Sequence, residues 1–518
     1  MSRIRRSFLA PRIRSNRRQK TVKVQSQNHV KVDHVDRISA LPNDLLCHIL
    51  SFLATKKAAA TSILSTRWRY LFTSLPNIHL EFDQSLRRFD PKSGKKYVDI
   101  MGPNYQRFAR LVDCCHRLIL QQKPYCLTKF HLSLEEFLEI FRVAIDSLIC
   151  AAISCGVQQL EVFVGRDRSN AFSPPGILSC PGIFSCKTLL EMKLESRFTD
   201  FYVPETVSLP NLKILHLAQF ILTDELSIPR LIQGCPVLIE LSFDCLTYSE
   251  GEVLTLLIKS PSLEKIYLHC VTDEWDIVLD IPSAVNLECE VEGASKTSIN
   301  APKLQHLHFD GDAVKVNILP NHKSLVEARI SVSCPYIVKT SDQEQLLRCE
   351  VAFELMNSSQ SVVSLYLLDA TVELLFYSQK LLPTFEKLTY LELEVRKYYD
   401  KHTRSWKMLS WLLESAPNLQ VLVFDEVFWD DRIESSAEDK KFEFLSAEPV
   451  PLCLPIHLRE VKIRKFNGKE YEFKLIDYIL QNVKALKKMT VGVLGHFGAR
   501  SKILSFKRCN NDCQIVFT

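Results

Sequence analysis

One short pattern of apolar positions, apolar-x-x-apolar-x-apolar, recurs along most of the chain. Alternating positions of this kind suit a short strand that buries one face and exposes the other. The fourteen copies begin at Leu75, Leu127, Val157, Leu189, Leu212, Leu238, Leu263, Leu304, Leu325, Val362, Leu388, Leu419, Leu458 and Leu486. Between residues 189 and 263 the copies start 23, 26 and 25 residues apart, a spacing typical of leucine-rich repeats. Longer intervals elsewhere predict an irregular solenoid with insertions.

A proline precedes the pattern by two residues in five of the copies. These prolines are Pro210, Pro236, Pro261, Pro302 and Pro417. Proline cannot continue a helix, so it ends the preceding segment and leads into the strand. One repeat cannot bury its apolar face alone, whereas stacked repeats bury a continuous core and align their strands in a parallel sheet on the concave side.

Side chains between and after the apolar positions should point outward onto that concave face. We select as candidates for binding a target protein Tyr267, His269, His306, His308, Tyr390 and Glu392. Tyrosine is enriched at protein interfaces, but for each residue an ordinary solvated sheet face is the alternative. His306 and His308 share one strand face, yet no cysteine or third histidine stands at a convincing metal-ligand spacing, so we expect no metal site.

Residues 35–82 carry a helical pattern instead. Pro42 and Asp44 suit the first turn of a helix. The apolar positions that follow form a wide helical stripe: Leu45, Leu46, Ile49, Leu50, Phe52 and Leu53. Further helices are predicted over 55–64 and 66–72. Three helices in so few residues make a poor independent core, so part of the stripe is expected to contact a partner.

The charge of the chain is unevenly distributed. Residues 1–32 hold seven Arg and three Lys without an acid, so the net charge of +5 leaves −5 for the remainder (5 − 10). We expect residues 1–34 to be a disordered arm, either a targeting signal or a solvated tail. No apolar run is long enough for a membrane span, and no secretory signal is recognisable. The 17 cysteines are therefore expected to be reduced, mostly buried thiols in the nucleus or cytoplasm.

Two segments resemble known plant domains. DRISALPNDLL at 36–46, ILSFL at 49–53 and TSILSTRWR at 61–69 closely resemble a plant F-box. The C-terminus is similar to the FBD domain that often follows plant F-box/LRR chains. The residues that carry this second resemblance are Pro451, Cys453, Leu454, Leu458, Val461, Ile463, Phe466, Gly468, Tyr478, Leu480, Asn482, Leu486 and Met489, followed by the tail from Ser505 to Phe517.

The resemblance implies an α/β fold with a small N-terminal three-helix F-box, an irregular leucine-rich-repeat solenoid with parallel strands on the concave side, and a C-terminal FBD cap. The expected bounds are 1–34 for the arm, 35–82 for the F-box, 83–440 for the solenoid and 441–518 for the FBD domain. By the same resemblance, the chain is expected to be the substrate-recognition subunit of an SCF (cullin–RING) ubiquitin ligase. It would bind a Skp-type adaptor, and through it a cullin, and present its concave face to a target protein.

Carried over residue by residue, the resemblance predicts an adaptor-binding set. Its members are Leu41, Pro42, Leu45, Ile49, Leu50, Leu53, Ser62, Leu64 and Trp68. Leu46 and Phe52 are interpreted as core residues of the F-box itself. No phosphate-binding loop, zinc-protease motif or nucleophile elbow occurs in the sequence, so we expect no catalytic residues, no cofactor and no enzyme activity. The alternatives are a non-degradative F-box scaffold, or an LRR/FBD module that binds protein or RNA.

Overall fold

The structure is a computed structural model that describes residues 38–82, 127–134, 142–165, 180–332, 342–394, 406–426 and 450–518, with short gaps, and isolated positions between 110 and 119. The predicted arm, residues 1–34, lies outside the described residues. The chain divides into two compact units, Met1–Leu46 and Cys47–Thr518. The described part of the first unit is a turn around Ile38 and the start of helix α1 (Asn43–Ser51).

The second unit begins with the rest of the helical segment. After α1 come α2 (Thr55–Ala60), the 3-10 helix η1 (Thr61–Ile63) and α3 (Trp68–Leu71). The three predicted helices are therefore present, although the second ends earlier as an α-helix and continues as a 3-10 turn. The helical segment meets the sheet at α2, where Thr55 Oγ1 accepts a hydrogen bond of 2.8 Å from the backbone N–H of His79.

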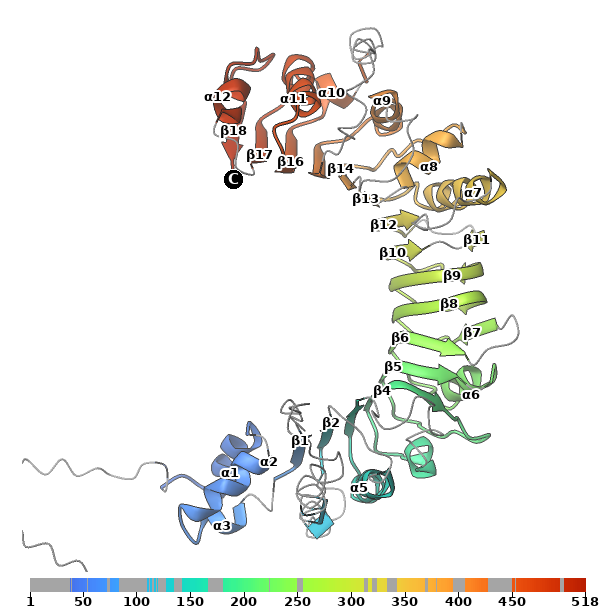
Figure 1. Cartoon of the computed structure of the whole chain (residues 1–518), viewed down its shortest axis with the longest axis vertical. Coiled ribbons are helices and arrows are strands. Elements are labelled where there is room, and N and C mark those ends of the chain that lie inside the picture. Colours follow the sequence, from blue (N-terminus) through green and yellow to red (C-terminus); the bar gives the residue numbers. More distant parts are fainter. Residues whose placement is uncertain are drawn as a thin grey trace, which may run out of the picture. The chain divides into compact units, whose positions relative to one another are not determined.

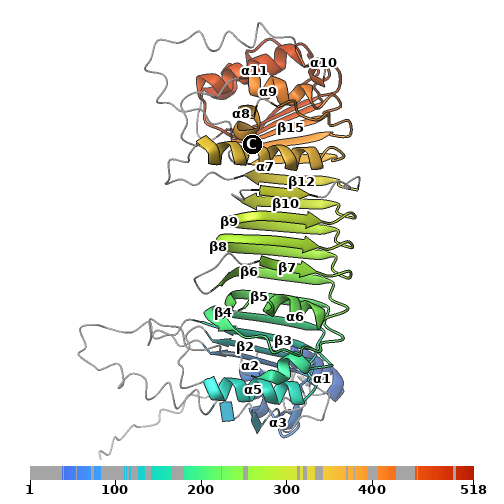
Figure 2. The ribbon, with the colours of Figure 1, turned by 90° about the vertical axis from the view of Figure 1, so that its right-hand side faces the viewer.

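A single parallel sheet of eighteen strands runs through the described part of the second unit, as Figures 1 and 2 show. Each strand pairs with the next in sequence, with two exceptions described below. The first ten paired in this way are β1 (Asn77–Phe82), β2 (Lys129–Leu134), β3 (Gln159–Val164), β4 (Glu191–Phe201), β5 (Ile214–Leu222), β6 (Glu240–Tyr248), β8 (Lys265–Asp280), β9 (Asn286–Asn300), β10 (His306–Gly311) and β12 (Glu327–Val332).

The sheet continues without a break to the C-terminus. The strands of this part are β13 (Ser364–Leu368), β14 (Tyr390–Glu394), β15 (Val421–Glu426), β16 (Glu460–Phe466), β17 (Lys488–Val493) and β18 (Gln514–Phe517). The two exceptions are β7 (Thr255–Lys259) and β11 (Lys315–Ile318), which pair with the second halves of β8 and β9. The long strands β8 and β9 thus each contribute to two sets of pairings.

Helices lie on one side of this sheet, and none is drawn over β8, β9 and β10 in its middle. Figure 2 views the sheet from that side, with α5, α6 and α7 in front of the strands. The helical elements of this layer are α5 (Arg142–Ser154), η4 (Pro181–Ser185), α6 (Ser227–Gln233), α7 (Asp342–Ser358), α8 (Thr371–Tyr377), α9 (Trp406–Glu414), α10 (Cys453–Ile456), α11 (Glu470–Asn482) and α12 (Ala499–Leu504). We call the other face, onto which side chains such as Tyr267 and His308 project, the open face.

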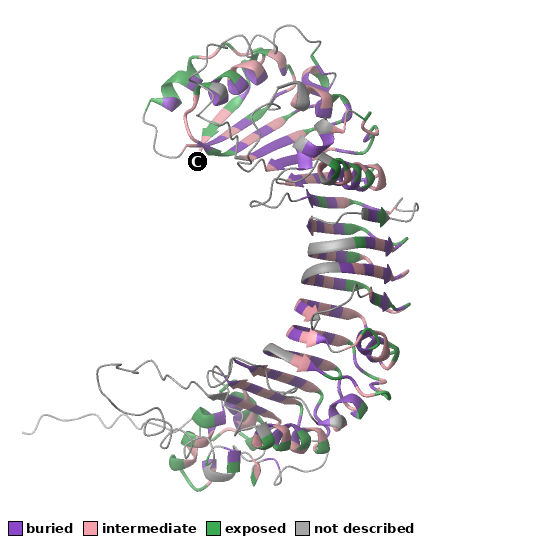
Figure 3. Cartoon of the chain, turned by 45° about the vertical axis from the view of Figure 1, so that its right-hand side comes forward, coloured by how far each residue is buried: buried purple, intermediate pink, exposed green. Residues whose placement is uncertain are grey.

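The apolar pattern forms the core of the solenoid. All three apolar positions in each of the fourteen copies, 42 side chains in all, are buried, and buried and partly exposed residues alternate along the strands in Figure 3. The sequence pattern therefore predicted fourteen of the eighteen strands, and the short strands β7, β11 and β18 do not carry it. It missed β9, whose core positions are Ala284, Leu287 and Cys289, because small residues replace leucine in two of three places.

The cysteines depart from the prediction at one pair. Cys150 in α5 and Cys180, directly before η4, form a disulfide with a Cα–Cα distance of 6.2 Å. This pair corrects the expectation of reduced thiols, because the packing of α5 against η4 brings together two cysteines that are 30 residues apart in sequence. Seven of the eleven other described cysteines are buried. Among the described helices, none has the length and apolar character needed to cross a membrane.

Candidate functional site

An apolar surface is exposed on the second half of α1. Ile49 in α1 is 45% exposed, and Leu53, in the bend two residues after the helix ends, is 38% exposed. Leu45 lies one turn before Ile49 in the same helix and is also half exposed. These three members of the predicted adaptor-binding set are available for contact with another protein.

The turn η1 and the residue after it expose further apolar side chains. Leu64 is 65% exposed, as the adaptor-binding set requires, and Ser62 is partly exposed. Ile63 is more exposed than either, at 86%, and was not selected. The sequence signal that could have found it is the pair of adjacent apolar residues in a short turn, of which a small bundle cannot bury both.

Three assignments within the helical segment need correction. Phe52, interpreted as a core residue, is 76% exposed and belongs to the exposed apolar surface. Leu50 and Trp68, selected as adaptor contacts, are 1% and 6% exposed and are core residues in this structure. Leu46 is buried as predicted. Leu50 lies one position after Ile49, so the rotation of about 100° per residue turns it away from the exposed side of the helix.

On the open face, polar side chains line up in rows across neighbouring strands. Parallel pairing without a shift places Ser242 beside Tyr267, Tyr267 beside Glu288, and Glu288 beside His308. The Glu288 carboxylate and the His308 Nδ1 atom lie 3.0 Å apart. At the end of this row, Arg329 lies over the ring of Tyr366 at 4.1 Å from its centroid.

A groove of about 520 Å³ follows this row over β6, β8, β9, β10 and β12. Its polar lining comes from Glu240, Ser242, Lys265, Tyr267, Asn286, Glu288, His306, His308, Glu327 and Arg329. Three of the residues predicted to bind a target, Tyr267, His306 and His308, therefore lie together in this groove. Its mixture of carboxylate, imidazole, amide and phenol groups suits hydrogen bonding to a polar surface of another molecule.

The surroundings of Tyr267 disfavour the loss of its proton. Burial raises the pKa of Tyr267 to about 12, and the nearby charges of Glu290, Asp244 and Glu288 add to the rise. Burial is the larger cause, because it disfavours the charged phenolate. The groove carries charges of both signs, with Glu240, Glu288 and Glu327 beside Lys265 and Arg329.

The other predicted target-binding residues lie outside the groove. His269 is two residues beyond Tyr267 on β8, with its Nδ1 atom 2.8 Å from Asp244 Oδ1. Tyr390 and Glu392 lie on β14, where the Tyr390 hydroxyl donates a hydrogen bond to Glu392. Glu392 is also paired with Arg464, and only 8% of its side chain is exposed. It therefore serves the packing of this part of the sheet.

Comparisons with known proteins match three parts of the chain. The F-box domain family matches residues 38–80, the family described as FBD-associated F-box protein At5g56370, LRR repeats, matches residues 145–366, and the FBD family matches residues 447–491. An Arabidopsis thaliana relative named for its F-box and LRR repeats, At5g41840, is 32% identical over 75% of this chain and 69% of its own length. The F-box/FBD/LRR-repeat protein At1g78750 of the same plant is 28% identical, over 93% of this chain and 96% of its own length.

Proposed function

Because the chain belongs to the plant family of F-box/LRR-repeat proteins that carry an FBD, we propose that it is the target-recognition subunit of an SCF (cullin–RING) ubiquitin ligase. Proteins of this family are in general non-catalytic adaptors. In the proposed assembly the F-box binds a Skp-type adaptor, which connects it to a cullin, and the open face of the sheet binds the target. The chain would contribute proximity between ubiquitin donor and target, not a chemical step.

The observation that carries the proposal is the exposed apolar surface of the helical segment. Ile49 in α1, Phe52 and Leu53 directly after it, and Ile63 and Leu64 leave large apolar side chains in water. A concentration of such side chains on a short segment costs free energy in the isolated protein and marks an interaction site. A subunit that covers it would recover this free energy through burial of apolar area.

The test is the affinity of the full chain for a plant Skp-type adaptor. We expect Ile49→Glu to weaken binding at least about tenfold, which corresponds to about 1.4 kcal/mol, because a carboxylate would be buried in an apolar interface. The matched control is Val143→Glu, a change of an equally apolar residue that is 79% exposed on α5, which should leave the affinity unchanged. Isothermal titration calorimetry with purified proteins measures both.

Equal adaptor affinity of Ile49→Glu and the unchanged chain would contradict the assignment. The buried Trp68 is a poor site for this test, because a change there would also damage the fold.

If the adaptor binds but proteins captured on the open face are not ubiquitinated in a reconstituted ligase, the chain is a non-degradative scaffold. Groove variants such as Tyr267→Ala and His308→Ala should then lose captured proteins without losing the adaptor.

A further inference from the structure

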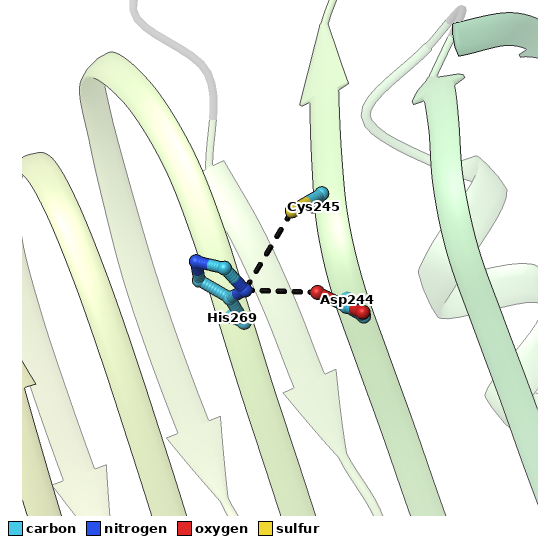
Figure 4. Close-up of side chains that lie close together, drawn as sticks. All are labelled: Asp244, Cys245 and His269. Carbon is cyan, nitrogen blue, oxygen red and sulfur yellow. Dashed lines mark hydrogen bonds and ion pairs between the residues drawn. The ribbon is translucent and has the colours of Figure 1, made fainter. Parts of the chain in front are cut away.

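Three potential metal ligands of different chemistry meet on the open face, beyond the end of the groove. Asp244 and Cys245 come from β6 and His269 from the neighbouring strand β8, and Figure 4 shows all three side chains pointing toward one another. His269 Nδ1 lies 2.8 Å from Asp244 Oδ1 and 3.6 Å from Cys245 Sγ. One ligand atom from each residue lies within 4.8 Å of the others.

A local irregularity of β6 creates this arrangement. Adjacent residues of a regular strand point to opposite faces, which would turn Cys245 away from Asp244. The pairing of β6 with β8 instead shifts between Asp244 and Leu246, and Cys245 has a φ of 50°. A non-glycine residue in this left-handed region is strained and is held there by its surroundings. The bulge therefore brings a thiol and a carboxylate to the same side.

The same left-handed conformation occurs in the neighbouring strand β5, where Gln219, at the position that corresponds to Cys245, has a φ of 58°. What distinguishes β6 is the chemistry of the residue at the bulge and of its neighbours. At this place β5 carries Ala218 and Gln219, whereas β6 carries Asp244 and Cys245. The residue opposite on the next strand is Asp244 for β5 and His269 for β6.

From this geometry we propose that Asp244, Cys245 and His269 bind a divalent cation of the zinc type. Zinc accepts thiolate, imidazole and carboxylate ligands in a tetrahedral site, which requires about 3.5 Å between the sulfur and nitrogen ligand atoms. The distance of 3.6 Å between Cys245 Sγ and His269 Nδ1 already meets this requirement. The thiolate selects against magnesium and calcium, which take oxygen ligands.

Metal binding changes the protonation of the site in a defined way. The hydrogen bond between His269 Nδ1 and Asp244 Oδ1 opens as both atoms turn to the cation, to a separation of about 3.4 Å in a tetrahedral site. Cys245 and His269 Nδ1 each bind as the deprotonated form. A water molecule or a side chain of a bound partner would supply the fourth ligand.

A second group on the next strands, Glu288, Glu290 and His308, offers oxygen and nitrogen atoms without sulfur. Lacking a thiolate, it is expected to be less selective for zinc. It serves as the internal comparison for the test.

The test is cobalt(II) and zinc(II) titration of the purified full chain, followed by absorption. We expect one equivalent of cobalt with a thiolate-to-metal charge-transfer band that zinc displaces. Cys245→Ser should remove this band, and His269→Ala should weaken the affinity at least tenfold. Cys509→Ser, which changes an exposed cysteine elsewhere, and His308→Ala, in the second group, should leave band and affinity unchanged.

A band of equal intensity in Cys245→Ser would overturn the proposal, as would a chain that takes up no cobalt. Far-ultraviolet circular dichroism checks that each variant is folded. If Cys245→Ser does not fold, Asp244→Asn replaces it in the comparison with an expected affinity loss of at least tenfold. Unchanged cobalt affinity of Asp244→Asn or of His269→Ala would show that the three residues contact one another without binding a metal. The result does not depend on adaptor binding and is therefore separate from the test of the proposed ligase function.

Discussion

Arg464 on β16 and Glu392 on β14 form an ion pair, although the two residues are 72 positions apart in the sequence. Two guanidinium nitrogens contact the two carboxylate oxygens, at 2.5 and 3.0 Å. The Glu392 side chain is 8% exposed and that of Arg464 is 49% exposed. The carboxylate is thus largely removed from water and depends on its partners, Arg464 and Tyr390, for compensation.

We expect Arg464→Ala to lower the free energy of unfolding by about 1–2 kcal/mol, because it leaves a mostly buried carboxylate without its cation. The value is at the lower end for a buried pair, since water screens the exposed half of the guanidinium. Chemical denaturation of the full chain measures it. Arg459→Ala, a change of an exposed arginine close by, is the control, and an equal loss in both variants would contradict a specific role of the pair.

For single residues, the sequence predicted the face of the sheet to which a side chain points better than it predicted how deeply that side chain is buried. Alternation along the strand correctly placed Tyr267, His306 and His308 on the open face. It could not reveal that Glu392 is nearly buried, because the arginine that covers it comes from a distant part of the chain. It also did not identify Cys245 as a neighbour of His269, since only a bulge turns that side chain to the open face.

The elements of the sheet pack so closely that some positions admit only glycine. Gly311 ends β10, and a Cβ atom there would lie 2.1 Å from the carbonyl oxygen of Val291 on β9. The contact is with backbone, so it cannot be relieved by turning a side chain. Either the strands must separate or the backbone of β10 must shift.

We expect Gly311→Ala to destabilise the chain by about 2 kcal/mol, the usual range for overpacking, and to lower the midpoint of thermal unfolding. The control is Gly182→Ala in η4, where the nearest atoms to an added Cβ are 3.7 Å away and the change should stay within about 0.5 kcal/mol. Differential scanning calorimetry compares the two. Equal midpoints for both variants would show that the strands separate without cost.

The prediction of helices and strands succeeded where the apolar pattern of a segment is regular, and it failed where a segment departs from that pattern. Leucine-rich copies located their strands, and the helical stripe after Pro42 located α1. β9 was missed because Ala284 and Cys289 are weak apolar signals, although the preceding Pro282 resembles the prolines of other repeats. The second pairings of β8 and β9 could not be predicted, since periodicity carries no information about partners.

In the molecule as a whole, the segments with separate family matches share one sheet. β16 and β17, within the FBD match, pair in parallel with each other and with β15 of the solenoid. The FBD is thus a continuation of the same stack, which ends in the four-residue strand β18. Short terminal strands limit edge-to-edge association of such sheets.

The other end of the sheet is closed by the helical segment. β1 pairs on one side with β2, and on its other side the backbone N–H of His79 donates to Thr55 Oγ1 of α2 at 2.8 Å. Thr55 is 6% exposed, so water cannot easily replace the threonine oxygen. The helix α2 thereby satisfies a backbone group at an edge that would otherwise present it unpaired.

We expect Thr55→Val to destabilise the chain by about 1–2 kcal/mol, because valine keeps the shape of threonine but leaves the His79 N–H without its acceptor. Thr55→Ser retains the oxygen and should recover most of the loss. Hydrogen exchange measured by mass spectrometry should show faster exchange in β1 for the valine variant, while β16 and β17 keep their protection, because repeats interact chiefly with their neighbours. Unchanged exchange in β1 would mean that α2 does not close this edge.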